Sequence, residues 1–199
     1  SNQFSKNVLQ STNSWKKTVS ANDLKGYGAD EFSKVKKGDY YEISLQVPVY
    51  IDLMTYADSS DLREEVYKAY ISRASDIGIT SKEFNNRPIM DEILKLRSEM
   101  SELVGFSNYA EYSTQSKMVE SPDAVIDFLN NLIELSTHQA KAELIDLESF
   151  AGHPLMPWDL MYYSEKLKQK TFSFKSTDLK PFFPESSVFD GLFETIQNL

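Results

Sequence analysis

The longest helical pattern of this chain begins with the stretch Ser121-Pro122-Asp123-Ala124-Val125-Ile126-Asp127-Phe128-Leu129 and continues to Ala151, before Gly152. Serine is a preferred N-cap, proline suits the first helical turn, and an acid there faces the positive end of the helix dipole. Gly152 is the expected stop. Apolar residues recur along the stretch at helical spacing: Val125, Leu129, Leu132, Leu144, Leu147 and Phe150. This single segment already favours a helical protein.

Helical patterns also cover most of the chain on either side of this stretch, since only seven Gly and seven Pro interrupt 199 residues. Upstream, they predict a first helix over 4–19 and further helices over 48–57, 61–74, 88–104 and 107–118. Downstream, we expect a helix from Pro157, a brief extended piece at 172–174, and two last helices capped by Ser176 and by Ser186 or Ser187. Aromatic and β-branched residues make 40–47 the best strand candidate.

These patterns predict a mostly α fold with at most one or two short strands. We expect residues 1–199 to form a single helical unit, and a division into 1–120 and 121–199 is the alternative. The chain starts with Ser1-Asn2 and its last helical pattern has no Gly or Pro terminator, so we expect a section of a longer protein.

The composition narrows the class of partner. Thirty acidic against 21 basic residues give a net charge of −9, which disfavours nucleic acids and anionic membranes as partners. The absence of cysteine excludes disulfides, thiol catalysis and thiolate metal sites. No apolar run is long enough to span a bilayer and no export leader opens the sequence, so we expect a cytoplasmic location.

Two histidines are the only imidazole ligands available, and their spacing argues against a metal site. His138 and His153 lie 15 residues apart. A zinc peptidase of the His-Glu-x-x-His type needs two imidazoles four residues apart on one helix face. Position 142 is an alanine. We therefore predict surface or capping roles for both histidines, and we assign no catalytic and no metal-binding residue.

Acidic clusters invite an acid–base interpretation, but thirty acids in 199 residues make such clusters inevitable. We expect solvated helix faces with local partners, such as Glu64 with Lys68 and Glu165 with Gln169. The clusters considered are Glu64 with Glu65, and Glu92 with Glu99, Glu102 and Glu111.

Aromatic and arginine side chains are the remaining candidates. Trp158 and Tyr162 are at i and i+4 of one predicted helix face, which is typical of a core stripe, with a substrate-channel wall as the alternative. Substrate-binding residues therefore stay unassigned. Helix arginines are usually exposed, but a buried one among Arg63, Arg73 and Arg97 would pair with an acid and hold neighbouring helices together.

The run Pro157-Trp158-Asp159-Leu160-Met161-Tyr162-Tyr163-Ser164-Glu165-Lys166 resembles a signature of the thimet oligopeptidase family of zinc metallopeptidases. Further pieces follow in the family's order over nearly the whole chain, and the bacterial oligopeptidase A branch is the nearest pattern. They include Phe4-Ser5-Lys6-Asn7-Val8-Leu9, Leu62-Arg63-Glu64, Asn86 with Pro88, Leu103 with Gly105-Phe106, and Gly191-Leu192-Phe193.

The resemblance implies a zincin-type enzyme with two mostly helical halves that face a deep channel. Such an enzyme hydrolyses short peptides with a zinc ion bound in the channel. In the family, a His-Glu-x-x-His helix and a later Glu hold the zinc, and all lie C-terminal to the region resembled here. None of them maps onto this chain. The resemblance thus implies a middle section that supplies scaffold and channel wall, binds no zinc and is inactive alone.

Two other functions stay open at this point: a non-catalytic helical module that binds peptides or a partner protein, and an enzyme with an unrecognised site. A section of a larger body should expose contiguous apolar surface and self-associate through it. A native binding module should show one groove and otherwise polar faces.

Overall fold

The computed structural model describes residues 2–27, 35–78, 82–174, 178–179 and 182–198. The predicted mostly helical class is confirmed. The helices are α1 (Asn2–Ser14), α3 (Val47–Tyr56), α4 (Ser60–Ile71), α5 (Arg87–Leu103), α6 (Tyr109–Thr114), α7 (Pro122–Ala151), α8 (Leu160–Phe172) and α9 (Glu185–Gln197), and η1 (Lys82–Phe84) is a 3₁₀ turn. The strands are β1 (Lys16–Val19), β2 (Lys36–Lys37) and β3 (Tyr40–Ser44).

The three strands form an antiparallel sheet in the order β1-β3-β2, one strand more than expected. The predicted strand over 40–47 is confirmed for Tyr40–Ser44. The predicted first helix through Val19 is wrong at its end, because α1 stops at Ser14 and the next residues pair with β3. Thr18 and Val19 are β-branched and suit this pairing, which lies opposite Glu42 and Tyr41 and buries Val19.

Helix ends follow local chemistry, with some shifts from the predicted caps. The Oγ of Ser59 accepts a hydrogen bond from the Leu62 amide, so Ser59 caps α4. Other predicted ends are shifted. The helix predicted over 107–118 is α6, which Asn108 caps and which ends at Thr114; the helix predicted from Pro157 begins at Leu160; and α9 follows Pro184 instead of Ser186 or Ser187. The extended piece predicted at 172–174 is wrong at its start, because Phe172 ends α8 and Ser173 is left-handed (φ 56°). The predicted cap Ser176 lies outside the described residues.

The core lies in what we call the N-terminal body, made of α1, the sheet, α3 and α4. Among the described residues, every buried apolar side chain except Leu147 belongs to positions 19–74. The buried cluster is built from the sheet, α3, α4 and the segment between β1 and β2, and includes Leu24, Ile43, Leu45, Leu53, Met54 and Val66.

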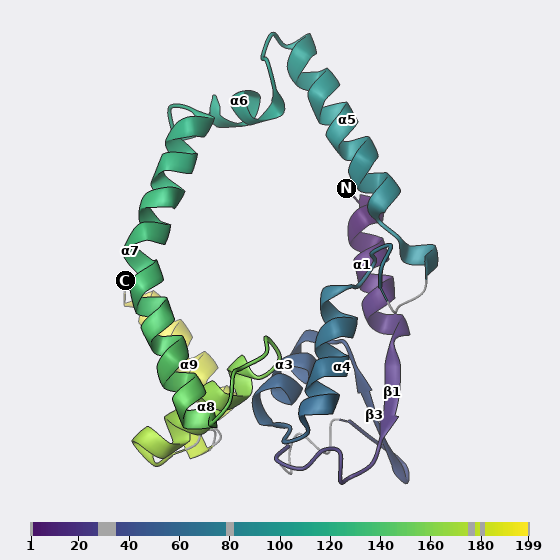
Figure 1. Ribbon diagram of the computed structural model, residues 1–199, viewed down its shortest axis with the longest axis vertical. Helices are drawn as coiled ribbons and strands as arrows, with labels where there is room; N and C mark the ends of the chain where they lie inside the picture. The colour runs from purple at the N-terminus through teal and green to yellow at the C-terminus, as the bar shows by residue number, and fades with distance from the viewer. Residues whose placement is uncertain (1, 28–34, 79–81, 175–177, 180–181, 199) are drawn as a thin grey trace.

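The rest of the chain leaves this body and comes back to it. Figure 1 shows α5 extending away from α1, α6 crossing over, and α7 returning towards α8, which packs beside α3. We call α5, α6 and α7 the arch. The predicted signals of α7 are confirmed: the Oγ of Ser121 accepts from the Ala124 amide at 3.1 Å, and Gly152 is left-handed with φ 80°.

Apolar stripes on the arch are present as predicted but are exposed within this chain. Leu96, Leu103, Leu129 and Leu132 are all exposed, and Leu135 keeps 74% of its accessible surface. The total accessible surface is 13975 Å². A compact protein of 22.8 kDa exposes about 9,600 Å², so this chain exposes roughly 4,400 Å² more. None of the described helices is both long and apolar enough to cross a bilayer.

Candidate functional site

The residues of the Pro157–Lys166 run connect the N-terminal body to α8. Their central contact is an ion pair between Arg63 of α4 and Asp159, the N-cap position of α8, with Nη2 2.6 Å from Oδ1. We call Arg63, Trp158, Asp159 and Tyr162 the α4–α8 joint. Both charged side chains are buried, Arg63 to 2% exposure and Asp159 to 4%.

Arg63 uses most of its hydrogen-bonding capacity in the joint. Its Nε donates to the Trp158 carbonyl at 3.2 Å, and its Nη1 donates to the carbonyls of Ala57 at 2.6 Å and Asp58 at 3.2 Å. The guanidinium lies 4.1 Å from the ring centroid of Tyr162. Together with the ion pair, these contacts use four of the five donors that an arginine carries, which is what a buried guanidinium requires.

Asp159 is also satisfied on both carboxylate oxygens. Oδ1 accepts from the Ser60 hydroxyl at 3.1 Å as well as from Arg63, and Oδ2 accepts from the Met156 amide at 3.3 Å. The sequence predicted that a buried arginine would pair with an acid and hold helices together. Arg63 meets that prediction across 96 positions of sequence.

The aromatic residues of the run contact α4 and the turn before it. The ring of Trp158 lies 6.0 Å from that of Tyr67, and Lys68 lies over it at 5.5 Å. The Tyr162 hydroxyl donates to Asp58 Oδ1 at 2.8 Å. Burial raises the pKa of Tyr162 to about 12, and the hydrogen bond to Asp58 adds to the rise because it favours the neutral phenol. Trp158 lies in the turn before α8 and not on the helix, so the predicted stripe on one helix face is wrong in this respect. Both rings are half-buried, and a channel-wall role for them stays a prediction.

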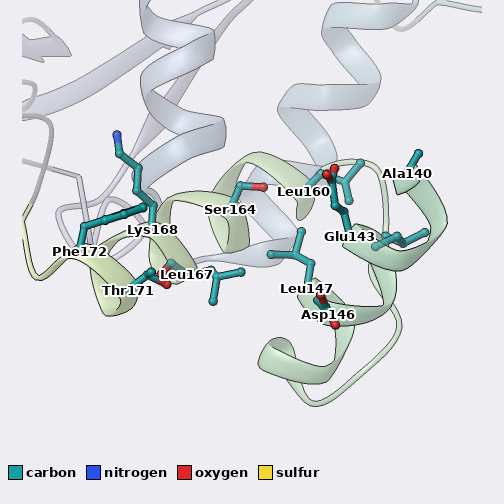
Figure 2. Close-up of a pocket in the computed structure, with 11 residues that line it drawn as sticks. Ala140, Glu143, Asp146, Leu147, Leu160, Ser164, Leu167, Lys168, Thr171 and Phe172 are labelled. Atoms are coloured by element: carbon teal, nitrogen blue, oxygen red, sulfur yellow. Dashed lines mark hydrogen bonds between the residues drawn. The ribbon is translucent and has the colours of Figure 1, made fainter. Parts of the chain in front are cut away.

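A groove of about 680 Å³ lies between α7 and α8 (Figure 2). Leu144, Leu147, Leu160, Leu167 and Phe172 supply its apolar lining, and charged side chains from the two helices border it: Glu143 and Asp146 from α7 and Lys168 from α8. An apolar floor with charged edges suits an apolar segment of polypeptide better than a small polar substrate.

The two histidines do not form a metal site. His138 is exposed on α7. His153 Nδ1 lies 2.8 Å from the Pro154 carbonyl and Nε2 lies 3.0 Å from the Tyr163 hydroxyl, so its ring holds the loop between α7 and α8. Over the described ranges, no group of three or more His, Cys, Asp or Glu side chains is placed to hold a metal ion. The zinc that the resemblance implies therefore does not fit these residues.

Several acidic side chains of the predicted clusters have structural partners. Glu64 pairs with Lys68, and Glu165 accepts from Gln169 at 3.0 Å, as predicted. Glu111 belongs to the cap of α6, where it accepts from the Asn108 amide group at 3.0 Å. Such contacts are typical of structural carboxylates.

One set of buried polar contacts had no sequence signal. Asn7 of α1 donates to the side chain of Asn86 at 2.9 Å, and Asn86 donates to the Phe4 carbonyl at 3.1 Å. This pair ties α1 to the start of α5. Only its occurrence within the family-like pieces Phe4–Leu9 and Asn86–Pro88 marked it.

The sequence pattern described as Peptidase family M3 matches residues 53–199, well over half of the chain. The chain belongs to peptidase family M3. The resemblance drawn from the Pro157–Lys166 run is thereby confirmed.

Relatives of the chain carry the names of peptidases, several of them oligopeptidase A. The chain is 40% identical to oligopeptidase A of Salmonella typhimurium over 210 residues, which cover 100% of this chain and 31% of that protein. It is 34% identical to the organellar oligopeptidase A of Arabidopsis thaliana over 220 residues, covering 100% of this chain and 27% of the relative. The dipeptidyl carboxypeptidase of Escherichia coli is 26% identical over 121 residues, covering 58% and 18%. The M3 chain thus spans about a third of the length of the oligopeptidase A proteins that it matches.

Proposed function

We propose that this chain is the helical scaffold section of a zinc-dependent oligopeptidase, a metalloendopeptidase that hydrolyses short peptides. The observation that carries the proposal is the 40% identity to an oligopeptidase A over the whole chain, against 31% of that relative's length. We take residues 1–199 as one section and place the catalytic centre in residues outside it.

The exposed surface supports a scaffold role. The arch presents apolar stripes on α5 and α7 to solvent, and the chain exposes roughly 4,400 Å² more than a compact protein of its mass. A standard protein–protein interface removes only about 800 Å² from each partner. The surplus is large enough for the remainder of an oligopeptidase to pack against the arch, leaving part of it as a channel wall.

In this proposal the zinc belongs to the whole enzyme and not to this section. When bound, it would activate a water molecule and polarise the peptide carbonyl. The described residues contribute no ligand set to it. Their contribution is to hold the helices that surround the reaction.

The decisive experiment compares this chain with the longer polypeptide encoded around it. We expect the longer protein to cleave a quenched fluorescent peptide, to lose that activity with a zinc chelator, and to regain it with zinc. The 199-residue chain should stay at background with or without zinc. Zinc-dependent cleavage by the chain alone, or none by the longer protein, would overturn the proposal.

The chain alone should self-associate through the arch. Sedimentation velocity should show species larger than a monomer, and Leu132→Asp on the exposed face of α7 should shift them towards the monomer. The neighbouring exposed change Asn131→Asp adds the same charge and should leave the distribution unchanged. A monomer with a high melting temperature would count against an uncovered section.

The groove between α7 and α8 favours a second candidate, a non-catalytic module that binds peptides or a partner helix. Saturable binding of short peptides by the isolated chain, abolished by Leu147→Asp, would favour it over the scaffold role. We also propose a cytoplasmic location for the protein. Among its relatives are a probable cytosolic oligopeptidase A, which agrees with this location, and an organellar oligopeptidase A, which represents the alternative. Cell fractionation of the longer protein tests it.

A further inference from the structure

The arch has two attachments to the N-terminal body, and they differ in chemistry. At one end, α5 begins beside α1, where Asn7 and Asn86 form a neutral amide pair. At the other end, α8 packs on α3, and the α4–α8 joint ties it to α4 through a buried ion pair. In Figure 1, α5, α6 and α7 follow one another from the first attachment to the second.

The contacts of the α4–α8 joint attach α8 to α4 and also fix the direction in which α8 points. A guanidinium is planar, and its donors form a rigid fork, so the positions of its acceptors follow from its orientation. In the joint those acceptors are carbonyls of the turn before α4, a carbonyl of the segment before α8, and the Asp159 carboxylate. The ring of Tyr162, one turn into α8, lies against the same guanidinium. A single side chain therefore orients the first turn of α8 relative to α4.

The orientation of α8 is passed on to α7. The loop between them is short and is held by His153 on Tyr163 and by Glu148, which accepts from the Leu155 amide at 3.1 Å. The rings of Phe150 and Tyr163 meet edge to face at 6.5 Å. Because α7 is coupled to α8 in this way, the angle set at Asp159 also sets the direction of α7.

We infer that the α4–α8 joint, through its Arg63–Asp159 ion pair, is a conformational device that sets the separation of α5 and α7. It fixes the angle at which α8, and α7 with it, leaves the N-terminal body. This inference does not depend on the proposed peptidase function, because it concerns the geometry of the chain itself.

Distances between paired spin labels test this inference directly. The chain has no cysteine, so two introduced cysteines are unique labelling sites. Glu92→Cys on α5 and Asn131→Cys on α7 report the arch, and Gln10→Cys on α1 with Ile51→Cys on α3 report the N-terminal body; all four positions are exposed. Electron double resonance then gives a distance distribution for each pair.

Two changes in the joint are compared with one outside it. Arg63→Lys keeps the charge and removes the fork. The double change Arg63→Met with Asp159→Leu removes both charges and fills the same space with apolar side chains of similar size. Arg87→Met removes an exposed arginine at the other end of the arch and serves as the matched control. Arg87 pairs with Asp91 at 3.6 Å and with Asp76, before α5, at 3.8 Å.

We expect both joint variants to shift and broaden the arch distribution while the body distribution stays as in the wild type. Arg87→Met should change neither. An arch distribution that stays narrow and in place in both joint variants would overturn the inference. Loss of both distributions together in both variants would also overturn it, because the ion pair would then support the whole fold and not the placement of the arch.

Discussion

The N-terminal body and the arch both carry apolar residues at regular helical spacing, yet they use them differently. In the body, Leu53 and Val66 are fully buried against the sheet. In the arch, Leu132 and Leu103 keep 46% and 87% of their accessible surface. Regular apolar spacing thus tells which face of a helix is to be covered, but not by which part of the protein. The body buries its own apolar pattern, whereas the described residues leave the apolar pattern of the arch exposed.

A change in the α4–α8 joint, which attaches the arch to the body through α8, should show the largest effect. Arg63→Met should lower the free energy of unfolding by about 3–5 kcal/mol, because it leaves the Asp159 carboxylate buried without its partner. Urea unfolding followed by circular dichroism measures this. The control Arg87→Met removes two exposed ion pairs, with Asp76 and Asp91, and should cost no more than about 1 kcal/mol. Equally small losses of unfolding free energy in Arg63→Met and Arg87→Met would mean that water reaches the α4–α8 joint in solution.

Matched leucine truncations test the contrast itself. Leu53→Ala should cost about 2–4 kcal/mol in urea unfolding, because it opens a cavity in a fully buried site. Leu132→Ala, on the half-exposed face of α7, should stay within about 0.5 kcal/mol in the monomer. A comparable loss at both positions would break the comparison, since it would place the α7 face in an interior.

A cap change addresses the arch alone. Ser121→Ala removes the hydroxyl that accepts from the Ala124 amide, and should destabilise the start of α7 by about 1 kcal/mol. Amide hydrogen exchange should accelerate in the first turns of α7 and not in α4. Ser121→Asp keeps a side-chain acceptor and should leave exchange near the wild-type rate. Faster exchange in α4 as well would indicate that body and arch unfold as one unit.

The smallest effect is a pH dependence at the joint. The folded-state pKa of Tyr162 is raised from 10.0 to about 12, so its neutral phenol stabilises the fold fully below pH 10. That contribution is lost as the pH rises from 10 towards and through 12. Thermal unfolding over this range should show a decline that Tyr162→Phe makes shallower, while Tyr112→Phe in α6 leaves it as in the wild type. An identical decline in both variants would remove Tyr162 from the explanation.

Sequence reasoning succeeded where the signal is local and failed where it is distant. Ser121, Pro122 and Gly152 set the ends of α7 within a few residues of chain, and the structure has them as predicted. The strand at Lys16–Val19 was missed because its stability comes from β3, whose Ser44 lies opposite Lys16. Helical spacing in the preceding residues extended the predicted helix too far.

The joint shows the same limit in the candidate site. Sequence patterns marked Arg63 as a candidate for a buried pair and marked the Pro157–Lys166 run as a family signature. They did not connect the two, since the contact spans 96 positions. The sequence predicted exposed apolar surface for a section of a larger protein, but not that α5 and α7 would carry it, because apolar spacing along a helix does not show whether another part of the chain covers that face.

The length of α7 gives the joint a mechanical consequence. Thirty helical residues form a rod about 45 Å long. A tilt of roughly 10° at its α8 end would carry the far end about 8 Å sideways, by the geometry of a lever of that length. Small adjustments of one guanidinium fork are therefore amplified into displacements the size of a side chain at the opposite tip.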